Sequence, residues 1–481
     1  MADGARHDII IRGGTVIDGT GGPRRAGDVA IDDDRITGVG DLSGATAGRE
    51  IDATGRIVAP GFIDAHTHDD RALLDNPSMD MKVSQGVTSV VVGNCGVSLA
   101  PLVMKDPPPP LDLIAGTDGF RFEKFGDFLD EVDKAPAALN AAFLVGHSTL
   151  RVGAMDRLDR AATADEIKMM RGKLDEGLQS GAVGFSTGLF YKPAQEAPTE
   201  EVIGIAQALK AHGARYVTHM RDEGDNVIQS LDETFRIGRE AHSPVIVSHH
   251  KVHGKHNFGH SRETLAHIDH HMEHQDIGFD VYPYIASSTV LKDDSIAVAE
   301  RVLITWSKAR PDLAGRELSE IADELGCDIY QAAAQLQPAG AIYFAMDEED
   351  VQRILSHPNA MIGSDGLPHD EHPHPRLWGT FPRVLGHYCR DLKLFSLEEA
   401  VRRMTGLTAA NFGLVDRGEI RVGALADICV FDEDKILDTA SFDDPIRPAA
   451  GIDHVLVNGR EVWAAGANTG NRPGRALRRG G

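Results

Sequence analysis

Cysteine is scarce in this chain, with 4 residues among 481. The four, at positions 95, 327, 389 and 429, are far apart and show no paired spacing. This excludes a disulfide framework and favours a reduced, cytoplasmic setting. No segment is apolar for long enough to span a bilayer, and the opening MADGARHDIIIRGG has no apolar core of signal-peptide length. We therefore expect a cytoplasmic protein that does not insert into membranes.

Positive charge is also in short supply. The 49 lysines and arginines are outnumbered by 73 aspartates and glutamates, which gives a formal net charge of -24. Such a balance argues against nucleic acid or an anionic membrane as a partner. With 42% hydrophobic residues the chain has an ordinary globular composition, and an enzyme acting on a small molecule fits it well.

The two ends of the chain have a sequence pattern typical of short β-strands separated by Gly and Asp turns. DIIIRGGTVIDG and GDVAIDDDRITGVG show it near the start, and GEIRVGALADICVFD and IDHVLVNGREVW show it near the end. We expect these pieces to pair with each other, so that residues 1–60 together with 414–481 form one small β domain.

Between the two ends, short apolar runs alternate with helix-period segments such as ADEIKMMRGKLDEGLQ and EVIGIAQALKAHG, which indicates βα units and a parallel sheet. Eight such runs favour an α/β fold of the (β/α)8 type, a TIM-like barrel over residues 61–413, with an insert at about 285–341 before the last strand. The runs are GFIDAHTH, TSVVVGNCG, AAFLVGHST, AVGFSTGLF, RYVTHMR, VIVSHHK, GFDVYPY and MIGSDG.

Polar side chains capable of binding metal stand where several of these runs end. In a barrel such strand ends converge on one mouth, where active sites lie. His66 and His68 are two apart on a strand and therefore point to the same face, as a chelating pair would. The whole set consists of His66, His68, Cys95, His219, His249 and Asp365.

Imidazole and thiolate donors together favour Zn²⁺, and three protein ligands with an open position are typical of a catalytic zinc site. Cys95 would supply an anionic ligand, since a bound zinc holds a thiol deprotonated. A cysteine nucleophile is the alternative role for Cys95. We favour the ligand role because several histidines crowd the same mouth and none stands out as a partner base.

The motifs at the strand ends resemble a known family. PGFIDAHTHDD, preceded by GGTVIDGTG, is similar to the amidohydrolase superfamily. The cysteine in GNCG, together with THMR, SHHK and IGSDGLPHDEHPHPR, resembles the N-acyl-D-amino-acid deacylases, or D-aminoacylases. The similarity extends over nearly the whole chain, including LQPAGAIYF in the insert.

The resemblance implies zinc-dependent hydrolysis of an N-acyl-D-amino acid, a small-molecule substrate, to a D-amino acid and a carboxylate. It implies a tight zinc site of Cys95, His219 and His249 and a second, weaker site of His66 and His68, bridged by Cys95. Asp365 would be the general acid/base. The α-carboxylate of the substrate would be bound by Lys251, Tyr282, Ser288 and Arg376.

The resemblance also implies a side-chain pocket formed by Phe190, Tyr343 and Met346. These large, largely apolar residues favour substrates such as D-Met, D-Leu or D-Phe. An N-acyl-D-glutamate or D-aspartate deacylase remains an alternative, because charged residues follow Ser288 in VLKDDSIAV. Two further alternatives remain. One is another amidohydrolase, such as a cyclic amidase or a dipeptidase, and the more remote one is a non-catalytic barrel scaffold.

Overall fold

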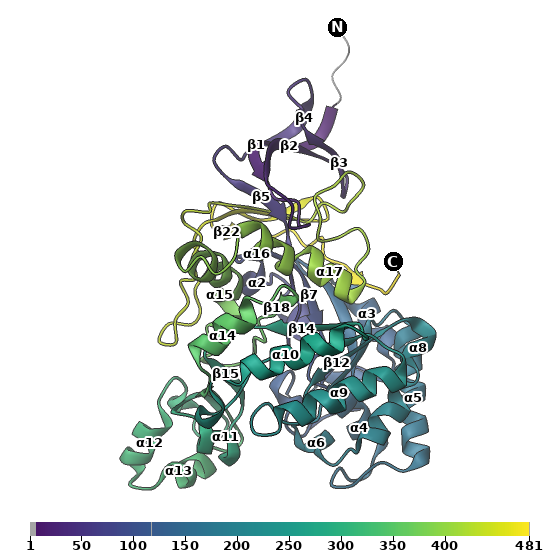
Figure 1. The fold of residues 1–481 in the computed structure, drawn as a ribbon, viewed down its shortest axis with the longest axis vertical. Coiled ribbons are helices and arrows are strands. Elements are labelled where there is room, and N and C mark those ends of the chain that lie inside the picture. Colours follow the sequence, from purple (N-terminus) through teal and green to yellow (C-terminus); the bar gives the residue numbers. More distant parts are fainter. Residues whose placement is uncertain (1–5, 117, 481) are drawn as a thin grey trace.

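The structure is a computed structural model that describes residues 6–116 and 118–480. It contains a barrel of parallel strands, a β domain at the end near the N-terminus, and an insert at the opposite end (Figure 1). Residues 1–5 and 481, which belong to the predicted β domain, lie outside the described residues. Among the described helices, none has the length and apolar character needed to cross a membrane.

Eight parallel strands form the barrel, and each predicted run overlaps one of them. Each strand pairs with the next along the chain. A backbone hydrogen bond of 3.1 Å from Ala65 N to Ile362 O joins the first strand to the last. The (β/α)8 prediction is therefore confirmed. The strands are β6(Phe62–Asp64), β7(Val87–Val92), β10(Asn140–Gly146), β11(Gly184–Gly188), β12(Arg215–His219), β13(Val245–Val247), β14(Ile277–Val281) and β18(Ala360–Ile362).

Helices cover the outside of the barrel (Figure 1). The predicted segment 164–179 is one of them, and it begins with a capping box in which Thr163 and Glu166 satisfy each other's backbone N–H groups. The main outer helices are α3(Phe125–Lys134), α5(Ala164–Gln179), α7(Thr199–Ala206), α9(Val227–Ala241), α10(Ser261–Met272), α14(Glu348–Leu355), α16(Leu397–Met404) and α17(Gly406–Phe412).

The barrel interior is a packed core rather than a channel. Its apolar side chains are buried, so polar chemistry is confined to the strand ends. These side chains include Ala65, Val91, Ala142, Leu144, Val183, Val217, Ile246 and Met361.

The β domain unites distant pieces of sequence, as predicted. β5 from the first piece pairs with β19 from the second, with Pro60 opposite Ile428. Near the C-terminus, β23(Ala476–Leu477) is not part of this sheet but pairs with barrel strand β10. The domain's strands are β1(Arg6–Val16), β2(Arg25–Asp32), β3(Arg35–Gly40), β4(Thr46–Asp52), β5(Ile57–Pro60), β19(Ile428–Phe431), β20(Ile452–Val457), β21(Arg460–Ala464) and β22(Ala467–Asn468).

The insert between β14 and β18 has a sheet and a core of its own. Its antiparallel strands lie in the order β15-β17-β16, and its helices pack on them. Because β15 follows β14 directly, the insert stands over the carboxyl ends of the barrel strands. Its elements are β15(Ala286–Val290), α11(Asp293–Val298), β16(Arg301–Ser307), α12(Leu318–Leu325), α13(Ile329–Leu336) and β17(Ala339–Phe344).

Candidate metal and substrate site

The six predicted metal-site and catalytic residues converge at the mouth of the barrel. His66 and His68 follow β6, and Cys95 lies three residues beyond β7. Potential ligand atoms from these residues form two buried groups, each with all atoms within 4.8 Å of one another, and both groups contain Cys95. One group is Cys95, His219 and His249; the other is His66, His68, Cys95 and Asp365.

Cys95 is the common point of the two groups. Its Sγ lies 3.3 Å from His66 Nε2, 3.4 Å from His249 Nε2 and 3.6 Å from His219 Nδ1. A thiolate in this position can bridge two metal ions, which matches the predicted arrangement. The donor set of imidazole nitrogens and one thiolate fits zinc.

Asp365 stands on the other side of this cluster. One carboxylate oxygen lies 3.1 Å from His68 Nε2 and 3.5 Å from His66 Nε2. The other oxygen lies 2.9 Å from the guanidinium of Arg376. Although burial opposes ionisation, the charge of Arg376 and the hydrogen bond from His68 hold the pKa of Asp365 well below its ordinary value. The group is therefore an anion at neutral pH.

The backbone at this mouth is conformationally strained. Cys95, His249 and Asp365 have φ values of +53°, +36° and +51°, in the left-handed region that non-glycine residues rarely adopt. Such conformations persist only where the surroundings impose them, and they cluster at functional sites. The site is also tightly packed beside His66, because a Cβ at Gly363 would lie 2.6 Å from His66 Cβ.

The charges around Cys95 favour its thiolate. Burial alone would raise the pKa of a thiol. The positive charges of His66 and His249 nevertheless lower the pKa of Cys95 well below its ordinary value. The site is thus electrostatically suited to an anionic sulfur even before any metal is considered.

Glu223 is a functional residue that the sequence reasoning missed. One carboxylate oxygen lies 3.0 Å from His249 Nδ1 and 2.7 Å from Lys251 Nζ, and the other lies 3.7 Å from His219 Nε2. These are the ring nitrogens on the far side from Cys95, so the carboxylate is placed to orient His249, while His219 Nε2 has no hydrogen-bond partner among the described residues. The only signal in the sequence is an acidic residue four positions after His219, in THMRDE.

Asp280 lies beside one candidate ligand of each group and was also missed. Its side chain accepts a 3.0 Å hydrogen bond from the backbone N–H of His249, and its second oxygen lies 3.5 Å from His66 Nδ1. Asp280 lies within β14, in an apolar run, where nothing in the sequence distinguishes it from a buried structural aspartate.

Of the four predicted carboxylate-binding residues, Arg376 contacts Asp365, and the other three line the same cavity as Asp365. Arg376, the first residue of α15(Arg376–Arg383), is fully buried, and its guanidinium lies 4.6 Å above the ring of Tyr282. Lys251 Nζ lies 5.5 Å from the same ring. Within the described chain, Nε and Nη1 of Arg376 and Oγ of Ser288 have no hydrogen-bond partner although they are buried. Unpaired buried donors of this kind are costly unless a ligand satisfies them.

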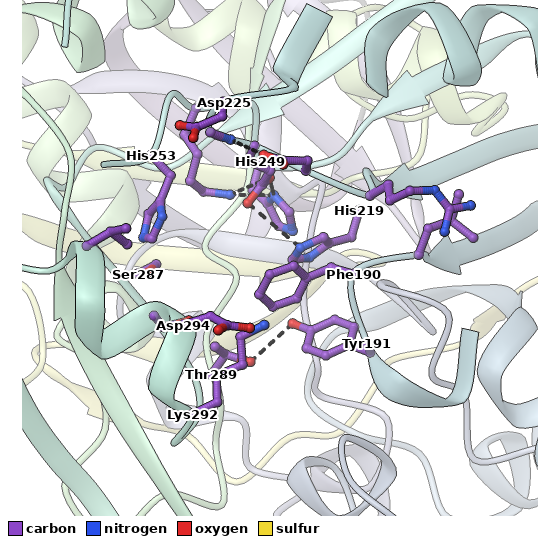
Figure 2. Close-up of a pocket in the computed structure, with 18 of the residues that line it drawn as sticks. Phe190, Tyr191, His219, Asp225, His249, His253, Ser287, Thr289, Lys292 and Asp294 are labelled. Carbon is purple, nitrogen blue, oxygen red and sulfur yellow. Dashed lines mark hydrogen bonds and ion pairs between the residues drawn. The ribbon is translucent and has the colours of Figure 1, made fainter. Parts of the chain in front are cut away.

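A cavity of about 600 Å³ opens over these groups, and Figure 2 shows part of its lining. Its lining includes His219, His249, Asp365, Lys251 and Ser288. Arg376 is not among the described lining residues; its Nη2 atom contacts Asp365 and donates to the backbone oxygen of Ser288. The volume suits a substrate the size of an acylated amino acid.

Phe190 lines this cavity, as predicted, and stacks on the candidate ligand His219 with ring centroids 5.2 Å apart. Lys292 belongs to the charged stretch VLKDDSIAV that follows Ser288. Its Nζ lies 3.3 Å from the centre of the Phe190 ring (Figure 2). Burial lowers the pKa of Lys292 to about 8. Val298 adds an apolar surface to the same lining.

Tyr343 lies away from this lining. It is fully buried in the core of the insert, on β17. Its hydroxyl donates to Val290 O at 2.8 Å and accepts from Lys292 N at 3.0 Å. The structure therefore does not support its predicted contact with a substrate side chain.

Met346 is placed differently from the prediction as well. It packs in a small cluster with Tyr282 and Tyr284, and its sulfur lies 4.0 Å from the hydroxyl oxygen of Tyr282. It is not among the described residues that line the 600 Å³ cavity. Of the three predicted pocket residues, the cavity includes Phe190.

This chain is similar to known proteins in both sequence and structure. The amidohydrolase family profile matches residues 49–335 and 273–463. A D-aminoacylase of Alcaligenes xylosoxydans xylosoxydans is 56% identical over 479 residues, covering 100% of this chain and 99% of its own. A crystal structure of D-aminoacylase has a TM-score of 0.97 at 57% identity, over 98% of this chain and 100% of that one. The N-acyl-D-glutamate deacylase of Bordetella bronchiseptica, complexed with zinc and a phosphonate inhibitor, has a TM-score of 0.94 at 45% identity, over 98% and 100%. This chain belongs to the amidohydrolase family, in the group that includes D-aminoacylase.

Proposed function

We propose that this protein is a zinc-dependent enzyme that hydrolyses N-acyl-D-amino acids to a D-amino acid and a carboxylate. The observation that carries the proposal is the position of Cys95, shared by two groups of potential ligands directly beside Asp365. The similarity to D-aminoacylase and to a zinc-containing deacylase supports both the reaction and the metal.

Cys95, His219 and His249 would hold the first zinc, and His66 and His68 would hold a second with Cys95 between them. When bound, zinc acts as a Lewis acid toward the acyl carbonyl and lowers the pKa of water toward about 7. Glu223 and Asp280 would keep the ligating residue His249 in place, the first through its second ring nitrogen and the other through its backbone N–H.

Asp365 serves as the general base and then as the general acid. Its depressed pKa keeps it ionised and able to accept the proton of the attacking water. The same carboxylate then returns the proton to the amide nitrogen, which otherwise leaves poorly. Arg376 fixes the orientation of the carboxylate through its 2.9 Å contact.

The unpaired donors around Asp365 suit the α-carboxylate of the substrate. Arg376 presents two free guanidinium nitrogens, and Ser288 presents a free hydroxyl. Lys251 and Tyr282 complete a polar patch beside them. A carboxylate placed there would form charge-assisted hydrogen bonds, the strongest kind available to a neutral-pH substrate.

A preference for one enantiomer at the α-carbon would follow if two groups of the substrate are held in fixed positions. With the acyl carbonyl held at the metal site and the α-carboxylate at Lys251 and Ser288, which line the cavity, only one enantiomer would direct its side chain into the open cavity. The D hand is taken from the relatives. Phe190 and Val298 offer an apolar wall, and on that basis we propose hydrophobic substrates such as D-Met, D-Leu and D-Phe.

A panel of N-acetyl-D- and N-acetyl-L-amino acids, with zinc content measured alongside, tests these proposals. N-acetyl-D-methionine should be cleaved at least 10- to 150-fold faster than its L-isomer, the effect of losing about 1.5–3 kcal/mol from one charge-assisted contact. It should also exceed N-acetyl-D-glutamate. A preference for the L-isomer would overturn the assignment, whereas a preference for D-glutamate would overturn only the hydrophobic pocket.

A further inference from the structure

Two outer helices carry a second histidine cluster, remote from the barrel mouth. α9 and α10 lie side by side on the outside of the barrel, one before β13 and one after it (Figure 1). His267 and His271 are four residues apart on α10 and share a face. Asp232 on α9 faces them, with its Oδ1 2.8 Å from His267 Nε2 and 3.9 Å from His271 Nε2.

The three potential ligand atoms lie within 4.8 Å of one another. Ligand nitrogens at about 2.0–2.1 Å from a tetrahedral zinc are separated by roughly 3.3 Å. The two observed separations from the Asp232 oxygen fall on either side of that value. Small rotations of these partly exposed side chains would therefore suffice to close around an ion.

An aromatic platform holds the two imidazoles in place. Phe235, buried one turn beyond Asp232 on α9, has its ring centroid 4.7 Å from that of His271 and 6.0 Å from that of His267. The two imidazole centroids are 4.7 Å apart. Their side chains are 24% and 26% exposed, so an ion can reach them from solvent although their rings are packed.

The geometry points to a divalent transition-metal site formed by Asp232, His267 and His271, separate from the catalytic centre. Two imidazoles and a carboxylate suit Zn²⁺, Ni²⁺ or Cu²⁺ rather than Ca²⁺ or Mg²⁺, which prefer oxygen ligands alone. Burial and the nearby charge of His267 also lower the pKa of His271, which favours the neutral ring that binds metal. Water would fill the remaining positions.

A bound ion would tie α9 to α10 across β13, the strand that leads to His249. Since an ion that binds only the folded chain stabilises it by mass action, zinc should raise the thermal midpoint of the folded enzyme. The effect belongs to the outer surface and leaves the residues of the catalytic cavity untouched.

The chain supplies its own matched control. His270 and His274 are also four residues apart in this region, but their rings are 6.5 Å apart and they belong to no group of potential ligands among the described residues. The double variant His270→Gln/His274→Gln therefore removes as many histidines as His267→Gln/His271→Gln while sparing the proposed site.

The experiment is equilibrium dialysis of the holoenzyme against micromolar zinc, followed by metal analysis, for wild type and both double variants. We expect wild type and His270→Gln/His274→Gln to hold one more zinc per chain than His267→Gln/His271→Gln, with unchanged kcat in all three. Asp232→Asn should weaken binding of that zinc and reduce the rise in thermal midpoint that zinc produces.

Equal zinc content in wild type and His267→Gln/His271→Gln would overturn the proposal. So would an equal loss in the two double variants, since it would indicate unspecific binding to surface histidines. Retained kcat in each variant verifies that the chain has folded, so that a loss of zinc reports on the site itself.

Discussion

The floor and the wall of the catalytic cavity are built in different ways. The floor consists of side chains at the ends of parallel barrel strands, each held by a neighbouring carboxylate, guanidinium or imposed backbone conformation. Much of the wall comes from the insert, whose antiparallel sheet has its own core. In the proposed function the chemistry would therefore take place at the barrel strand ends, and part of the contact with the substrate side chain would come from the insert, which has its own core.

This division suggests which changes should have large effects. Substitutions in the floor alter groups that touch the metal or the reacting atoms, whereas substitutions in the wall alter single contacts with one portion of the substrate. If floor and wall differ in this way, the loss of activity should decrease in order from substitution of Cys95, through Asp365 and Glu223, to Lys292.

Cys95→Ala should have the largest effect. It removes the atom shared by both ligand groups, so zinc content and activity should be lost together. Metal analysis of the purified variant, with the kcat for N-acetyl-D-methionine measured on the same sample, checks this. Cys327→Ala is a suitable control, because that cysteine lies in the insert and is not in either group.

A Cys95→Ala variant that binds zinc at full occupancy and unchanged affinity but is inactive would contradict the ligand role. The alternative, a cysteine nucleophile, would then gain support. Such a result would also weaken the contrast between floor and wall, since the floor would no longer be organised around a metal.

Asp365→Asn should come next. The amide keeps the shape and much of the hydrogen bonding but cannot take up and return a proton, so kcat should fall by about 10²–10⁴-fold with zinc retained. Steady-state kinetics with metal analysis measures both. A near-normal kcat would remove Asp365 from the mechanism and leave its contact with Arg376 as a purely structural ion pair.

The residues of the floor could be predicted because the ends of the barrel strands can be recognised in the sequence. A polar residue that ends an apolar run lies at the mouth of a barrel whatever its neighbours are, so His66, Cys95 and Asp365 could be grouped without coordinates. Glu223 and Asp280 could not be assigned in this way. Their roles depend on which ring nitrogen they reach, a distance that no spacing encodes.

The wall could not be predicted because its register is set within the insert. In an antiparallel strand successive side chains point to opposite faces, so a shift of one residue exchanges cavity for core. Tyr343 faces the core of the insert, where its hydroxyl is held by backbone groups of the neighbouring strand and turn. Lys292 reaches the Phe190 ring instead, a contact between a loop and a strand end far apart in sequence.

Glu223→Gln should have an intermediate effect. The side chain is not among the groups proposed to react, but it contacts His249 Nδ1 at 3.0 Å and Lys251 Nζ at 2.7 Å. Loss of such a partner typically costs 10–100-fold in metal affinity or activity. Zinc affinity measured by competition with a chelator separates this role from a merely structural one. Unchanged affinity in a folded variant would show that the imidazoles are positioned without it.

Lys292→Met should have the smallest effect and should act on substrate choice. Lys292 is a cation at the wall of the cavity, 3.3 Å from the Phe190 ring centre. Its contact with an acidic substrate side chain in this partly open setting is worth about 0.2–1 kcal/mol, roughly 1.4- to 5-fold. The variant should therefore lower kcat/KM for N-acetyl-D-glutamate by that factor relative to N-acetyl-D-methionine.

Because burial lowers the pKa of Lys292 to about 8, its charge is present below that pH and lost above it. In wild type the ratio of kcat/KM for D-glutamate to that for D-methionine should thus fall as the pH rises through 8, and in Lys292→Met it should stay flat. An identical pH profile in both proteins would show that Lys292 does not contact the substrate and that the wall discriminates through shape alone.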